Sequence, residues 1–143
     1  MKVVITRVTK ASVKINKKTI SEIENGLLVL VGFTHEDNIN KIKYIVNKII
    51  NLRIFNDNKG MNKSVLDING SILSVSQFTL YADTRKGRRP SFENALNSED
   101  ASKLYDLFNK ELSNHITTKT GIFGEDMQVE SINDGPVTII IEN

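Results

Sequence analysis

One run of seven residues, Leu27-Leu-Val-Leu-Val-Gly-Phe33, limits the possible folds more than any other part of this sequence. Successive side chains of a β-strand point to opposite faces of the sheet, so a strand that is apolar on both faces must be covered on both. Asn25-Gly26, a dipeptide that favours a tight turn, comes directly before the run. We therefore expect this strand in the middle of a sheet, with a helix packed over it.

Two segments have the spacing of amphipathic helices. Isoleucine and valine recur at three- and four-residue steps from Ile42 to about Asn51, after N-cap candidates at Asp37 and Asn38. A second helix is expected from Ser98, because two acids follow it and stabilise the positive end of a helix. The predicted buried stripe of this second helix is Ala101, Leu104, Leu107, Phe108 and Leu112.

The remaining apolar segments are short and have the character of strands joined by turns. They are residues 3–8, 12–16, 20–23, 52–55, 117–120, 127–132 and 137–141. Two helices among many short strands indicate an α+β fold, with a mostly antiparallel sheet that curves toward a barrel. A chain of 143 residues fits one domain, so we expect a single domain over 1–143.

Composition excludes several kinds of site. The chain has no cysteine, which rules out disulfides, thiolate metal sites and cysteine nucleophiles. The start of the chain, Met1–Arg7, lacks the apolar core of a signal peptide, and no apolar run approaches the ~20 residues that span a bilayer. We therefore expect a cytoplasmic protein with no membrane partner.

The segment Ser71–Asp83 carries the residues that a ligand site could use. Asn69-Gly70 predicts a hairpin turn before it, and Ile72–Tyr81 has the β-branched and aromatic composition of a buried strand. Ser76-Gln-Phe-Thr79 interrupts that strand with three hydrogen-bonding side chains, and burying such groups unpaired costs roughly 1–3 kcal/mol each. These side chains either form a polar rung on a half-exposed strand or face a ligand.

A basic loop, defined here as residues 85–90, follows this segment. It places four cations within five residues, at Arg85, Lys86, Arg88 and Arg89. The net charge of +2 is too small to predict a nucleic-acid partner by itself. The local clustering of charge is what favours contact with phosphates.

The sequence is poor in ordinary catalytic groups. Its only histidines, His35 and His115, lie in a turn and at the end of a helix, and we expect structural roles for both. Thr79 could act as a nucleophile only with a base in hydrogen-bond reach. No histidines and carboxylates have the spacing of a metal site, and we expect neither a metal nor a cofactor. If the protein is an enzyme, much of the chemistry comes from its substrate.

Two positions have two interpretations each. Arg7 shares a face with Val3 and Ile5, so its side chain either reaches water at the end of the strand or is held inside. The Gly135-Pro136 bond forms either an ordinary turn before the last strand or a fixed cis bond that presents carbonyls to a ligand. The residues by themselves leave both choices open.

Four motifs together resemble the D-aminoacyl-tRNA deacylases. They are Ser76-Gln-Phe-Thr-Leu-Tyr-Ala-Asp83, Arg85-Lys-Gly-Arg-Arg-Pro-Ser-Phe92, Thr120-Gly-Ile-Phe-Gly-Glu-Asp-Met127 and Asn133-Asp-Gly-Pro-Val-Thr138. The resemblance runs the whole chain, and several long motifs in the right order are more specific than any one alone. It implies a homodimeric hydrolase that cleaves the ester between a D-amino acid and the terminal ribose of tRNA, with mischarged glycyl-tRNA as a further substrate. The implied partners are D-aminoacyl-tRNA and a second copy of the chain, and not DNA.

The same resemblance implies a role for each residue of the Ser76–Thr79 segment. Gln77 and Thr79 are the expected catalytic residues. Ser76 and Phe78 line, together with them, the pocket that holds the adenosine and the ester. The 2′-hydroxyl of the tRNA is expected to assist catalysis, which agrees with the missing base.

A second set of roles concerns chirality and RNA binding. Gly135 and Pro136 of one subunit are expected to form a cis bond and to enter the partner's pocket, where they bind the substrate and reject L-amino acids. Arg7 is expected to brace this pair from the first strand. The basic loop is expected to bind the phosphates of the tRNA.

Two other classes of function remain open. A non-catalytic tRNA-binding module would need only the basic loop and would bind charged and uncharged tRNA alike. A conventional threonine hydrolase would use Thr79 and would turn over a simple ester without RNA.

Overall fold

The apolar run forms β3 (Gly26–Gly32), which lies in the middle of a six-stranded sheet as expected. In this computed structural model, which describes all residues of the chain, β3 pairs antiparallel with β1 (Lys2–Ile15) on one side. On the other side it pairs in parallel with β6 (Ser71–Ser76), and β6 pairs in parallel with β7 (Thr118–Thr120). The sheet is therefore mixed, and its antiparallel part is built around β1.

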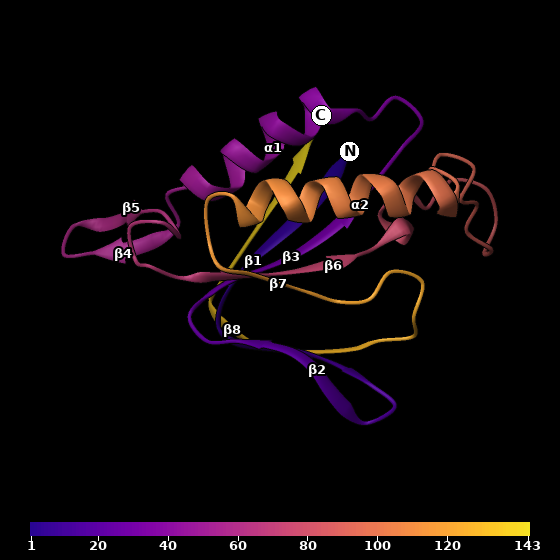
Figure 1. The fold of residues 1–143 in the computed structure, drawn as a ribbon. Helices are drawn as coiled ribbons and strands as arrows, with labels where there is room; N and C mark the ends of the chain where they lie inside the picture. Colours follow the sequence, from indigo (N-terminus) through magenta and orange to yellow (C-terminus); the bar gives the residue numbers. More distant parts are fainter.

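The two longest strands bend the sheet towards a barrel. β1 pairs antiparallel with β8 (Gln128–Glu142) over almost its whole length, and its second half also pairs with β2 (Lys18–Ile23). Ser21 Oγ of β2 donates a hydrogen bond of 2.6 Å to the carbonyl of Thr120 in β7, which links the two ends of the curved sheet. The expected α+β fold with a curved, barrel-like sheet is confirmed (Figure 1).

Two helices, α1 (Ile39–Asn51) and α2 (Ser98–Ser113), pack side by side over one face of the sheet (Figure 1). Asn38 caps α1, since its side chain accepts from two backbone amides of the first turn. Asn97, and not Ser98, caps α2 in the same way. Neither helix is long and apolar enough to cross a membrane.

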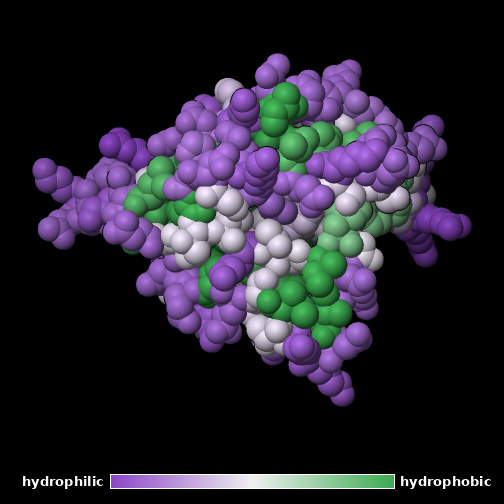
Figure 2. Space-filling model, in the orientation of Figure 1, coloured by the Kyte–Doolittle hydropathy of each residue, from purple (hydrophilic) through white to green (hydrophobic).

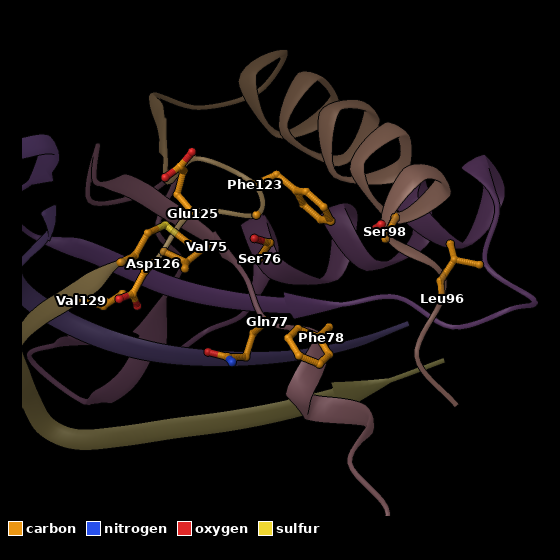
Figure 3. A pocket seen from close by; sticks show the side chains of 13 residues that line it. Val75, Ser76, Gln77, Phe78, Leu96, Ser98, Phe123, Glu125, Asp126 and Val129 are labelled. Carbon is orange, nitrogen blue, oxygen red and sulfur yellow. The ribbon is translucent and has the colours of Figure 1, made fainter. Parts of the chain in front are cut away.

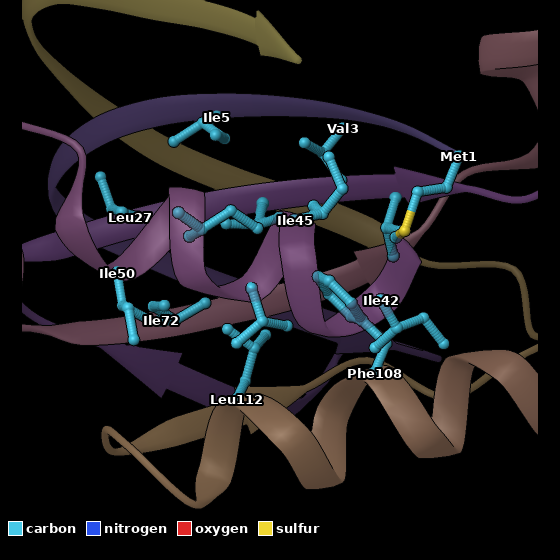
Figure 4. Close-up of a cluster of buried hydrophobic side chains, with 14 of the residues drawn as sticks. Met1, Val3, Ile5, Leu27, Ile42, Ile45, Ile50, Ile72, Phe108 and Leu112 are labelled. Carbon is cyan, nitrogen blue, oxygen red and sulfur yellow. The ribbon is translucent and has the colours of Figure 1, made fainter. Parts of the chain in front are cut away.

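The main hydrophobic core lies between the helices and the sheet. Figure 4 shows side chains from both helices meeting those of β1 and β3. Fully buried members of this cluster include Val3, Ile5, Leu27, Ile42, Ile45, Ile72, Phe108 and Leu112. A second, smaller hydrophobic cluster fills the inside of the curved sheet. Its seven residues come from β1, β2, β3 and β6: Val8, Ala11, Val13, Ile23, Leu28, Leu73 and Val75.

Several expected turns and strands differ in the structure. Asn69-Gly70 does not make a hairpin, because the following strand, β6, pairs in parallel with β3; Asn69 has a φ of 51° at the end of a helical turn instead. The hairpin in this region joins β4 (Phe55–Asp57) to β5 (Gly60–Lys63), so the strand expected over 52–55 begins only at its last residue. The two closing strands expected around Asn133 are one continuous strand, β8.

The buried stripe of α2 also differs at one position. Ala101, Phe108 and Leu112 are buried as expected, and Leu104 packs partly against the core. Leu107 is 41% exposed, and Tyr105 takes the buried place that the spacing assigned to a leucine. Helix geometry explains the exchange, because Ala101, Tyr105, Phe108 and Leu112 follow one another at four-, three- and four-residue steps, and Leu107 lies off that stripe.

Candidate active site

A pocket of about 540 Å³ opens where β6 ends. Figure 3 shows that its wall comes from segments far apart in the sequence, with the end of β6 facing the segment that joins β7 to β8. The start of α2 adds a third side. The lining residues are Val75, Ser76, Gln77, Phe78, Leu96, Ser98, Ala101, Phe123, Gly124, Glu125, Asp126, Met127 and Val129.

The chain leaves the sheet within the pocket wall. β6 ends at Ser76, and Phe78–Tyr81 forms η1, a single turn of 3₁₀-helix, so the strand expected to reach Tyr81 is five residues shorter. The amide of Gln77 donates 2.7 Å to the carbonyl of Val31, and the carbonyl of Gln77 then accepts from Leu80. Gly32 permits this turn, because a Cβ there would lie only 2.8 Å from the Gln77 carbonyl oxygen.

The turn separates the four expected pocket residues. Ser76, Gln77 and Phe78 line the pocket, whereas Thr79 is exposed and outside its lining. The side-chain amide of Gln77 donates a hydrogen bond of 2.5 Å to Thr79 Oγ1, so the two expected catalytic residues do contact each other. No ionisable side chain hydrogen-bonds to Thr79.

Neither of the two histidines lines this pocket. His35 Nε2 lies 2.9 Å from the carbonyl of Glu93, and His115 Nε2 lies 3.7 Å from a carboxylate oxygen of Glu111 on the same helix. No group of three or more histidine and carboxylate side chains is arranged to hold a metal ion.

The basic loop is anchored at the rim of the pocket. Asp83 and Ser91 exchange two backbone hydrogen bonds of 2.8 and 3.0 Å, which close the loop at its base. Directly beyond this base, the ring of Phe92 packs edge-on against the pocket residue Phe78, with 5.1 Å between centroids. The cations of the loop therefore project next to the pocket mouth, where all of them are exposed.

The four loop cations are not equivalent. Arg85 forms a forked ion pair with Asp83, with N–O distances of 2.7–3.1 Å. Hydrogen bonds from the Arg85 guanidinium lower the pKa of Asp83 to about 2. Lys86, Arg88 and Arg89 form no ion pair. Three cations are thus free to meet phosphates, where the sequence suggested four.

The opposite side of the pocket is acidic, a feature that the sequence reading did not find. Glu125 and Asp126 lie across the pocket from Phe78 and Leu96 (Figure 3), and neither forms an ion pair. They belong to the motif Thr120–Met127, for which the sequence predicted no role, and only the fold brings them to the site. Figure 2 shows apolar residues gathered below the helices, where β2, β8 and the segment joining β7 to β8 lie in Figure 1.

Arg7 is held inside, 5% exposed, at a bulge in β8. Thr6 pairs with Thr138 and Val8 with Asn133, so residues 134–137 have only Arg7 opposite them. Its Nη1 donates 2.5 Å to the carbonyl of Ile54, and its Nε lies 3.0 Å from Asp134 Oδ2 and 3.2 Å from the Asp134 carbonyl oxygen.

Gly135 and Pro136 directly follow Asp134, the residue that Arg7 contacts. Their peptide bond is cis, as the resemblance implied, and both residues are exposed. Gly135 has a φ of 118°, and a Cβ there would lie 2.9 Å from Arg7 Nη2, so both the backbone conformation and the close approach of Arg7 require glycine. Neither Gly135 nor Pro136 lines the pocket of its own chain.

The curved sheet and its two helices form a fold that this chain shares with proteins of known structure. A family model described as D-Tyr-tRNA(Tyr) deacylase matches residues 4–142, and the chain belongs to this family. The chain is similar to a solved structure named "c-Myc DNA Unwinding Element Binding Protein", with 43% identity, a TM-score of 0.94, and coverage of 100% of this chain and 99% of that one. A second, described as a probable eukaryotic D-amino acid tRNA deacylase, has 17% identity, a TM-score of 0.85 and coverage of 98% and 97%. This second likeness shows the fold alone.

Proposed function

We propose that the protein hydrolyses the ester bond of D-aminoacyl-tRNA, releasing the free D-amino acid and the tRNA, and that it also accepts mischarged glycyl-tRNA. The observation that carries this proposal is the match of residues 4–142 to the deacylase family. The pocket at the end of β6 is the site we assign to the reaction.

The size and lining of the pocket suit the end of a charged tRNA. Its volume of about 540 Å³ falls within the range of roughly 300–1,000 Å³ typical of small-ligand sites. Phe78 is 56% exposed at the rim, where its ring offers a stacking surface for a base. Such stacking contributes about 1–3 kcal/mol per base.

The charges around the pocket support one orientation of the substrate. An aminoacyl-tRNA carries an ammonium group at the amino acid and phosphates along the RNA. The carboxylates of Glu125 and Asp126 favour the ammonium end, while Lys86, Arg88 and Arg89 favour the phosphates on the other side. The ester lies between them, next to Ser76 and Gln77.

The absence of a base near Thr79 favours assistance by the RNA. In the proposed reaction, water adds to the ester carbonyl carbon, the bond to the ribose oxygen breaks, and a proton passes to that oxygen. The neighbouring 2′-hydroxyl of the tRNA can relay this proton. Gln77 contributes a side-chain amide that can donate to the carbonyl oxygen as its negative charge grows.

Chiral selection requires a second copy in this proposal. Gly135 and Pro136 are exposed and lie outside their own pocket, so they can contact a substrate only in a partner subunit. Their backbone carbonyls would receive the ammonium group and occupy the space of an L side chain. Arg7, buried against Asp134, would hold the pair in place.

The deciding experiment compares release of labelled tyrosine from D- and L-tyrosyl-tRNA. We expect cleavage of the D-ester only, strong loss when the terminal 2′-hydroxyl is replaced by hydrogen, and substantial activity in Thr79→Ala. Gln77→Ala should lose more than Thr79→Ala. Equal rates on the two enantiomers would reject the proposed selection. If Thr79→Ala, folded and able to bind tRNA, lost all single-turnover cleavage, Thr79 would be the nucleophile.

A nucleic-acid-binding role without catalysis is the second candidate. The basic loop and the printed name of the 43% identical structure both favour it. Binding of duplex DNA, uncharged tRNA and D-aminoacyl-tRNA should therefore be compared at several salt concentrations. Our proposal expects a preference for the charged tRNA, and a rise in KM when Lys86 and Arg88 are changed to glutamate. Equal binding of all three, with no ester cleavage, would establish the second candidate.

A further inference from the structure

We infer that Tyr105 is a positioning residue for this reaction, whose hydroxyl ties together the two walls of the pocket. The inference rests on the proposed function, because the pocket it stabilises is the one assigned to the ester.

The first wall is held through Ser74. Tyr105 lies on α2 and is 3% exposed, and its hydroxyl donates a hydrogen bond of 2.8 Å to the carbonyl of Ser74. Ser74 is two residues before the pocket residue Ser76 on β6. The amide of Gly121 donates 2.9 Å to the same carbonyl. A single oxygen thus joins α2, β6 and the segment after β7.

The second wall is held through the ring of Tyr105. Its centroid lies 5.9 Å from that of Phe123, with an angle of 43° between the ring planes. Phe123 lines the pocket on the side that faces Gln77 (Figure 3). It belongs to the same segment as Glu125 and Asp126, so the ring of Tyr105 supports the wall that carries the acidic residues.

The hydroxyl itself needs an explanation, since phenylalanine would fill the same space in the core. Burial raises the pKa of Tyr105, so the group stays a neutral donor. Its partner carbonyl belongs to Ser74, which is 0% exposed and whose own Oγ has no hydrogen-bond partner. A satisfied buried hydrogen bond of this kind rigidifies the contact between helix and strand and favours a single arrangement of the two.

Loss of the hydroxyl should therefore disturb geometry more than binding. A displacement of about 1 Å at a reacting centre can cost on the order of 100-fold in rate. For Tyr105→Phe we expect a smaller shift, with about a tenfold fall in single-turnover rate on D-tyrosyl-tRNA and less than about a twofold change in KM. The ratio of D- to L-cleavage should fall as well.

Two matched variants separate positioning from general destabilisation. Tyr44→Phe removes a hydroxyl from a tyrosine that is 50% exposed on α1, and Ile42→Val trims a fully buried core residue remote from the pocket lining. Neither should change the rate or the enantiomer ratio, although Ile42→Val should lower Tm. If Ile42→Val, at an equal loss of Tm, slowed cleavage as much as Tyr105→Phe, the inference would be overturned.

A second readout does not depend on catalysis. Amide hydrogen exchange in residues 74–77 and 121–124 should be faster in Tyr105→Phe than in the wild type, in both segments together, and unchanged in Tyr44→Phe. Unchanged exchange in either segment would overturn the inference even in an active enzyme. Faster exchange in both, in a protein that cleaves no ester, would retain the structural link and reject the proposed function instead.

Discussion

β3 and β8 flank β1 and both pair with it antiparallel along residues 2–8, yet they meet opposite environments. All residues of β3 except Leu30 are buried, whereas β8 has no buried residue. The end of β8, Val137–Ile141, is as rich in valine and isoleucine as β3 is in leucine and valine, so composition does not separate these two stretches. β3 has a second neighbour in β6 and lies under the helices, while β8 pairs with β1 alone. Strand neighbours, more than strand sequence, decide burial here.

The outer edge and outer face of β8 are therefore open in a single chain. Val137, Ile139 and Ile141 turn toward the core and are half-buried, while Ile140 is 65% exposed and Ile132 60% exposed. An open apolar strand is a template for pairing with another chain. This contrast with β3 is the physical support that the structure gives to the proposed homodimer.

The largest expected loss of stability is in the buried strand, β3. Leu27→Ala in β3 empties a site with no exposed surface, and we expect it to lower the free energy of unfolding by about 2–5 kcal/mol. Urea unfolding followed by circular dichroism measures the change. A loss below about 1 kcal/mol would mean that the core around β3 collapses into the space. The burial of β3 would then matter no more for stability than the exposed position of β8.

The next effect tests the link between β1 and β8. Arg7→Met should cost about 1.5–3 kcal/mol, because it leaves the carbonyl of Ile54 without its charged donor. Lys14→Met is the matched control, since Lys14 also joins β1 to a carboxylate of β8, Glu130, but on the surface. An exposed pair of this kind contributes little to stability. Equal losses in urea unfolding would show that burial of Arg7 adds nothing.

Sequence alone could predict the elements whose signal is local. The apolar run of β3, the three- and four-residue spacing of α1 and the start of α2 all follow from periodicity. Ser76 and Gln77 stand out as candidates because polar side chains interrupt an apolar strand, whereas the role of Phe78 is implied only by the resemblance to the deacylases. In each case the deciding residues are neighbours in the sequence.

The features that sequence could not predict depend on distant partners. β6 ends at Ser76 because the carbonyl of Gln77 accepts from Leu80 in the next turn and the chain bends beneath Gly32. The acceptor of the Tyr105 hydroxyl is one such partner, since the carbonyl of Ser74 lies on β6, 31 residues earlier in the chain. The acidic wall of the pocket has the same origin: its residues lie in the motif Thr120–Met127, but only the fold brings Glu125 and Asp126 into the same pocket as Gln77.

A smaller effect concerns the open side of β8. Ile140→Ala is the counterpart of Leu27→Ala, and at low protein concentration we expect less than about 0.5 kcal/mol, because Ile140 is already exposed. Since we propose a homodimer, the loss should grow as protein concentration rises. Urea unfolding at two protein concentrations measures the loss of stability and its dependence on concentration, and sedimentation reports the oligomeric state. A loss of stability that does not depend on protein concentration would show that Ile140 is not part of a subunit interface.

The smallest effect is a pH dependence of the surface pair between β1 and β8. The hydrogen bond from Lys14, together with the charge of its ammonium, holds the pKa of Glu130 below its usual value of 4.5. A carboxylate whose pKa is lower in the folded state stabilises the fold above its unfolded pKa, and this contribution is lost as the pH falls through the folded pKa. The stability difference between wild type and Lys14→Met should thus be constant above about pH 5 and shrink on acidification.

Urea midpoints of both proteins between about pH 7 and pH 3 measure this small difference, and added salt should reduce it at the upper end, because salt screens exposed charges. Lys43→Met is the control, since Lys43 is exposed on α1 and forms no ion pair, so its difference from wild type should not follow the titration of Glu130. A Lys14→Met difference that stays constant to pH 3, or grows, would show that Lys14 stabilises β8 through its aliphatic stem, which packs whatever the charge of Glu130. The edge of β8 would then resemble the covered strand β3 more closely than its exposure suggests, because apolar contact and not charge would hold it to β1.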